Sequence, residues 1–217
     1  PDLKYANKSI VDKYFTVEKY YNEHSKFTRT TLNANNRVMT DLTRLDKTIN
    51  TTWQLEHLLK DTNDVKAYLS LPDEVFEYGI DVSNMVEQEH KLGDRGIVMV
   101  DTPDPLCLAA DLFSMEDFTV FAMTERSLFR ALLDKFAVTL YKSIDKTSSN
   151  FPGHLWRIYG PEYATPPYLP PDLFIDYVVK YDSRIIEIIH RDNGYARVHC
   201  HGRIHDVLKY IVQMGAD

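Results

Sequence analysis

The chain has 217 residues, of which 44% are hydrophobic, 26% charged and 12% aromatic, and its formal net charge is −7. This ordinary globular composition excludes a wholly disordered chain, and the acidic balance argues against nucleic acid as the main partner. Two cysteines exclude a disulfide framework, and no apolar stretch approaches the roughly 18 residues of a membrane span. With no signal peptide visible, we expect a cytoplasmic protein that does not bind membranes.

The N-terminal part of the chain is predicted to hold several helices and one β-hairpin. Apolar residues at helical spacing predict a helix over 8–24. Two Thr-rich segments flank an Asn-rich turn, which predicts a β-hairpin at about 27–44. Two short helices are expected over 53–60 and 62–71, and a longer one over 72–93.

The rest of the chain alternates strand and helix patterns. Strands are predicted at 96–101, 155–160 and 195–201, and helices at 115–146, 172–191 and 204–214. This alternation is typical of an α/β fold with a parallel sheet. No Gly-x-Gly-x-x-Gly motif follows any strand, whereas long loops do, so a (β/α)₈ TIM barrel fits better than a dinucleotide-binding fold.

A complete barrel needs about 250 residues, and only three parallel strands are predicted here. The chain also ends where the next strand is expected to begin, and its first residue is not Met. We therefore expect a single domain over 1–217 that is an incomplete TIM barrel. Its N-terminal helix and hairpin would occupy 8–45, and its β/α units would occupy 62–217.

The third predicted strand carries the strongest candidate site. Arg197, His199 and His201 alternate along it and share one face, with Cys200 on the other. Two imidazoles at this spacing can converge on one Zn²⁺, with a third protein ligand required. The alternative is that both histidines bind substrate or water without a metal.

Polar residues at the ends of the other two strands are further candidates. Asp101 ends the first strand and Glu162 follows the second, where barrel enzymes place catalytic groups, so either can be a general acid or base. Arg157, Tyr163 and Arg197 are candidates for binding substrate. The alternatives are that Asp101 caps a loop and that Arg157 forms a surface ion pair.

The segment 156–202 resembles the uroporphyrinogen decarboxylase superfamily. The matching stretches are WRIYGPEYATPPYLPPDLF, YVVKY, IIEIIHRDNG and RVHCHGRIHDVL. This resemblance implies a (β/α)₈ barrel of the uroporphyrinogen decarboxylase type. The superfamily includes a cofactor-free decarboxylase of porphyrin biosynthesis and corrinoid-dependent methyltransferases that use zinc to activate a thiol.

The chain departs from both branches of the superfamily. It has no RQAGR-like segment, which the decarboxylases use to bind substrate carboxylates. The methyltransferases carry a His-x-Cys pair at a strand end, where this chain has His199 and His201. The resemblance implies metal-assisted methyl transfer, with zinc on these histidines and a corrinoid protein as partner.

Two alternatives stay open. In a cofactor-free decarboxylase, Arg157 and Arg197 would hold the carboxylates of a tetrapyrrole, and Asp101 or Glu162 would stabilise the protonated pyrrole. In a non-catalytic barrel, the chain would bind only a tetrapyrrole or a partner protein.

Overall fold

The computed structural model describes all 217 residues, which divide into two compact units. One unit comprises residues 1–6, 76–109 and 133–217, and the other comprises residues 7–75 and 110–132. The helix α6 (Arg126–Asn150) belongs partly to each unit. No helix combines the length and the apolar character that crossing a membrane requires.

The unit over 7–75 and 110–132 is built on an antiparallel sheet in the order β2-β3-β4-β5. Its strands are β2 (Phe15–Tyr21), β3 (Ser25–Ala34), β4 (Arg37–Asp46) and β5 (Thr52–Glu56). The unit also holds α1 (Lys8–Tyr14), α2 (Thr62–Leu69), α5 (Met115–Thr124) and the start of α6. The predicted hairpin is confirmed: β3 and β4 pair antiparallel, and Asn35 and Asn36 turn the chain with positive φ.

Three helix predictions in the N-terminal part are wrong in whole or in part. The expected helix over 8–24 ends at Tyr14, and residues 15–21 form β2, where aromatic and β-branched side chains pair with β3. The segment expected as a helix over 53–60 contains β5, which extends the same sheet. In the segment 72–93, only α3 (Ser83–Leu92) is an α-helix. A 3₁₀ turn (Asp73–Phe76) and β6 (Tyr78–Asp81) occupy the part of the segment before it.

The other unit contains a small antiparallel ribbon and a parallel sheet. The ribbon pairs β1 (Asp2–Tyr5) with β6. The sheet has the order β7-β8-β9 and consists of β7 (Met99–Pro103), β8 (Leu155–Tyr159) and β9 (Tyr195–His199). Both pairs of strands are parallel, as predicted.

Short helical segments connect the strands of this unit. The 3₁₀ turn η2 (Gly93–Arg95) precedes β7, α4 (Pro105–Ala110) follows it, and η3 (Pro161–Ala164) follows β8. A continuous helical stretch then comprises α7 (Pro171–Phe174), a π-helical turn (Ile175–Val179) and α8 (Lys180–Arg191). After β9, the 3₁₀ turn η5 (Ile204–Asp206) leads to α9 (Leu208–Gln213).

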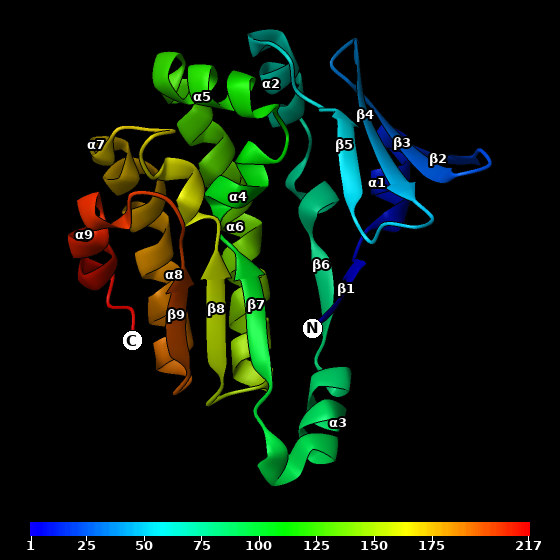
Figure 1. Cartoon of the computed structure of the whole chain (residues 1–217). Helices are drawn as coiled ribbons and strands as arrows, with labels where there is room; N and C mark the ends of the chain where they lie inside the picture. The colour runs from blue at the N-terminus through cyan, green and yellow to red at the C-terminus, as the bar shows by residue number, and fades with distance from the viewer. The chain divides into compact units, whose positions relative to one another are not determined.

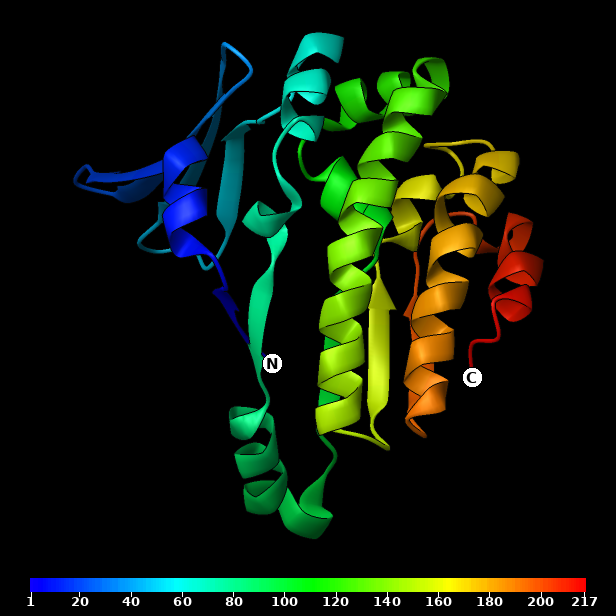
Figure 2. The same cartoon turned by 180° about the vertical axis from the view of Figure 1, so that it is seen from behind.

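Helices cover only one face of the parallel sheet. Within this unit, α6 and α8 lie behind the strands in Figure 1 and in front of them in Figure 2. Side chains alternate accordingly: Val100, Trp156 and Ala196 are buried on the helix side, while Asp101 and Arg197 on the other side are exposed. The fold of this unit is α/β, and its three strands form an open sheet rather than a closed barrel.

Replacing Ile158 with alanine tests this packing. Ile158 is fully buried in the central strand β8, so Ile158→Ala removes buried apolar volume that neighbouring side chains cannot refill. We expect a loss of about 3 kcal/mol in the free energy of unfolding, measured by urea denaturation. Ile97→Ala is the control, because Ile97 is 73% exposed, and equal losses in the two variants would contradict the assigned layers.

Candidate functional site

Two rows of side chains cross the face of the parallel sheet that carries no helix, which we call the open face. The first row consists of Asp101, Arg157 and Arg197, which are paired in register across the three strands. Nη2 of Arg157 donates a hydrogen bond to Oδ2 of Asp101. The buried Nε–H of Arg157 has no acceptor in the structure.

The position of Asp101 differs from the sequence prediction. Asp101 does not end its strand but is the third residue of β7, which continues to Pro103. Because the strand covers Met99–Pro103 rather than the predicted 96–101, Asp101 lies in the middle of β7, paired with Arg157 on β8. The ion pair that was the alternative expectation for Arg157 is therefore present, and Asp101 is the partner of Arg157 in it.

The second row lies one step nearer the C-terminal edge and includes Tyr159 and His199. The guanidinium of Arg157 lies over the Tyr159 ring, with its central carbon 5.9 Å from the ring centroid. His201 follows two residues after His199, and the Nε2 atoms of the two rings are 2.9 Å apart. The rings are nearly perpendicular, at 85°, so one imidazole donates an N–H to the other.

The spacing of the histidine pair can be compared with that of two zinc ligands. Two nitrogens bound to one tetrahedral zinc are roughly 3.3 Å apart, so the separation of 2.9 Å requires only a small adjustment. The chain contains no group of three or more His, Cys, Asp or Glu side chains that could hold a metal ion. The spacing of His199 and His201 therefore fits two zinc ligands, and no third ligand lies beside them.

Glu162 and Tyr163 lie in η3, directly after β8, and belong to neither row. Oε2 of Glu162 accepts a hydrogen bond from the backbone N–H of Gly160 at 3.0 Å. The same loop is attached to the end of β9, because the hydroxyl of Thr165 is 2.7 Å from the backbone oxygen of His201. These contacts hold the C-terminal edges of β8 and β9 together beside the histidine pair.

Two buried aspartates lie near this edge, and sequence reasoning missed both. Asp104 follows β7 and Asp182 lies on α8, and both residues are fully buried. Oδ1 of Asp104 accepts the backbone N–H of Cys107 at 2.6 Å, whereas Oδ2 of Asp104 and both carboxylate oxygens of Asp182 have no partner. Burial raises the pKa of both carboxyls, and the charge of Asp182 raises the pKa of Asp104 further.

Gly160 makes the close packing around Asp104 feasible. Its φ is +126°, and a Cβ there would lie about 2.0 Å from Oδ1 of Asp104. Cys200 lies close enough to Glu162, Asp104 and Asp182 for their charges to act on its thiol. Burial, followed by the charges of Glu162 and Asp104, raises the pKa of Cys200 to about 12, so the thiol is protonated at neutral pH.

A weak signal for Asp182 is present in the sequence. It occupies a position four residues after Val178 and three before Ile185, on the apolar stripe of the helix. A lone Asp on such a stripe indicates a buried carboxyl. Asp104 has no comparable signal, because it stands in a Pro-rich loop where aspartate is common.

The pH dependence of stability tests the state of Asp182. Its pKa is raised in the folded chain, so the folded state keeps a proton that the unfolded state loses above a pH of roughly 3.9. Its contribution to stability is therefore fully present below that pH and is lost as pH rises through the folded pKa. We expect Asp182→Asn to raise the urea midpoint relative to the parent at about pH 8 and to change it little at about pH 4.

Glu187→Gln on the same helix is the matched control, because the Glu187 side chain is exposed and paired with Arg184. The urea midpoints of both variants and of the parent are measured across the same pH range and compared. A constant difference between Asp182→Asn and the parent at every pH would show that the Asp182 carboxyl does not titrate on unfolding.

Comparisons with known proteins give a likeness of fold. No protein-family model matches the chain, and no curated protein matches it. A solved structure of a methyltransferase from Methanosarcina mazei is similar, with a TM-score of 0.52 and 13% sequence identity. The match covers 77% of this chain and 48% of that chain, so the chain spans about half the length of the methyltransferase. At this identity, the likeness concerns the fold alone.

Proposed function

We propose that the chain forms part of a (β/α)₈ barrel of the uroporphyrinogen decarboxylase type and that its open face lines the barrel interior. Three observations support the proposal: the parallel order β7-β8-β9, helices on one face only, and a fold like about half of a methyltransferase. Barrel strands direct alternate side chains inward, and catalytic groups gather at their C-terminal ends. The open face would then be the floor of an active site.

Methyl transfer is the function that this geometry supports best. The observation that carries it is the histidine pair at the C-terminal end of β9, whose two Nε2 atoms approach each other beside an Arg-containing row. When bound, a metal would supply a Lewis acid that favours the thiolate form of a substrate thiol. His199 and His201 would hold it, with a further ligand from whatever segment covers the open face.

The other open-face residues would bind and orient the substrate. Arg157 and Arg197 are neighbours in register and would hold an anionic group, with Asp101 fixing the guanidinium of Arg157. We assign Glu162 as the general acid or anchor and Tyr163 as a substrate contact, because both follow β8 at the C-terminal edge. The methyl donor would be a corrinoid carried by a partner protein.

Removing the histidine pair tests methyl transfer. We expect the purified protein to demethylate methylcobalamin in the presence of a thiol, followed by the change in visible absorption. The double variant His199→Ala, His201→Ala should lower this rate by about 100-fold or more and should also lower the zinc content. His205→Ala is the matched control, because His205 is fully exposed and close in sequence.

Cofactor-free decarboxylation is a second candidate, and the adjacency of Arg157 and Arg197 favours it. Two neighbouring guanidinium groups suit a substrate with several carboxylates. Conversion of uroporphyrinogen by metal-free protein, together with no demethylation of methylcobalamin, would support decarboxylation over methyl transfer. Equal methyl-transfer rates for the parent and the double histidine variant would contradict the proposed role of the histidine pair.

A further inference from the structure

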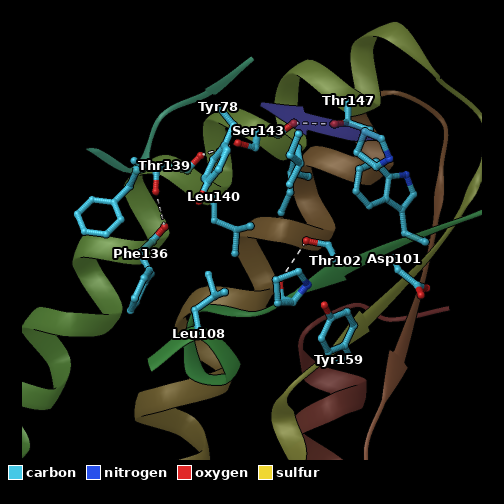
Figure 3. A pocket seen from close by; sticks show the side chains of 16 residues that line it. Tyr78, Asp101, Thr102, Leu108, Phe136, Thr139, Leu140, Ser143, Thr147 and Tyr159 are labelled. Atoms are coloured by element: carbon cyan, nitrogen blue, oxygen red, sulfur yellow. Dashed lines mark hydrogen bonds between the residues drawn. The ribbon is translucent and has the colours of Figure 1, made fainter. Parts of the chain in front are cut away.

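An apolar pocket of about 300 Å³ lies at the outer edge of the parallel sheet. All its lining residues belong to the unit that contains the sheet, and they come from Pro1, Phe76, the β1–β6 ribbon, β7, α4, α6 and β8. Figure 3 shows the labelled side chains of the ribbon, β7 and α6 around this pocket. Neither the histidine pair nor Arg157 or Arg197 lines it.

Aromatic rings form much of the pocket wall. Phe76, Tyr78, Phe136, Trp156 and Tyr159 all line it. The rings of Phe76 and Phe136 meet edge to face with their centroids 6.0 Å apart, which attaches the 3₁₀ turn before β6 to α6. Rings arranged in this way favour a planar aromatic guest, which can stack or present its edge to them.

The polar groups of the wall are mostly neutral hydroxyls. Thr139, Ser143 and Thr147 are spaced four residues apart on α6 and face the pocket together (Figure 3). Each hydroxyl donates to a backbone carbonyl in the preceding turn of the helix. These hydroxyls are therefore donors already in use, and none of them offers a charge to a ligand.

The pocket has a buried end and a charged rim. Trp156, Thr102 and Thr147 are almost completely buried, whereas the side chain of Asp101 is 46% exposed. Asp101 is the only Asp, Glu, Lys, Arg or His side chain that lines the pocket. Its Oδ2 accepts the hydrogen bond from Arg157, and its Oδ1 accepts none in the structure. One carboxylate oxygen at the rim can therefore accept a hydrogen bond from a ligand.

We propose that this pocket binds a neutral, planar aromatic molecule whose hydroxyl group donates a hydrogen bond to Oδ1 of Asp101. A ligand with its own negative charge is disfavoured, because no Lys, Arg or His side chain lines the pocket to replace the lost hydration and the rim carries the carboxylate of Asp101. The proposal does not depend on methyl transfer, because binding alone defines it.

The volume agrees with a ligand of one or two rings. An apolar cavity of roughly 150 Å³ in another protein accommodates benzene. The present pocket, at about 300 Å³, has room for a fused pair of rings. 2-Naphthol combines this size with one hydroxyl and is the probe for the experiment, while 2-naphthoate has the same rings and a negative charge.

Trp156 reports binding directly. The chain has two tryptophans, and Trp53 is 46% exposed on β5, in the other unit. Trp53→Phe therefore leaves the indole N–H of Trp156 as the single tryptophan resonance in the spectrum of isotope-labelled protein. We expect 2-naphthol to shift this resonance in a saturable manner, and 2-naphthoate to bind at least tenfold more weakly by calorimetry.

Ser143→Leu, made in the same background, fills the pocket from α6 and should weaken 2-naphthol binding at least tenfold. Ser149→Leu is the matched control on the exposed side of the same helix and should leave binding unchanged. Thermal unfolding of both variants establishes that they are folded. A Trp156 resonance that 2-naphthol leaves unmoved, equal binding of 2-naphthoate, or unchanged binding by a folded Ser143→Leu variant would each overturn the proposal.

Discussion

The parallel register of β7, β8 and β9 is the constraint on which the candidate site depends. Because the strands are aligned without offset, Asp101, Arg157 and Arg197 form a single row, and His199 stands beside Tyr159 in the next. Alternation along each strand then separates this polar face from the apolar face beneath α6 and α8. A shift of one residue in any strand would place its charged side chain in the helix-covered core, where the desolvation cost is high.

The presence of the three strands of this sheet and the shared face of Arg197 and His199 could be predicted from sequence because the patterns there are local, whereas the bounds of β7 and β9 were not: β7 covers Met99–Pro103, and β9 ends at His199, before Cys200 and His201. Arg197, Val198 and His199 alternate in character, and the apolar stripe of the helix ending at Arg191 identifies its buried side. The N-terminal segment was harder, because residues 15–21 carry apolar groups at positions that suit a helix as well as a strand. Pairing with β3, a non-local interaction, decides in favour of the strand.

The candidate site was predictable in composition but not in its pairings. The sequence indicates that Asp101 and Arg157 each stand on a strand, yet only the register reveals that they bond to each other. The same holds for the buried carboxyls: Asp104 and Asp182 are 78 positions apart in sequence, yet the fold brings them close enough for the charge of Asp182 to raise the pKa of Asp104. Contacts of this kind depend on tertiary structure, which residue spacing does not encode.

The aspartate on the open face and the two buried aspartates, Asp104 and Asp182, are in opposite electrostatic environments, and this contrast bears on function. On the open face, the side chain of Asp101 is partly exposed and paired with that of Arg157. Behind the same strand edge, burial favours the neutral forms of Asp104 and Asp182. Because Asp101 also lies at the rim of the apolar pocket, a ligand there would contact the same carboxylate that orients Arg157. A ligand in the pocket and an anion on the open face would thus both act on the carboxylate of Asp101.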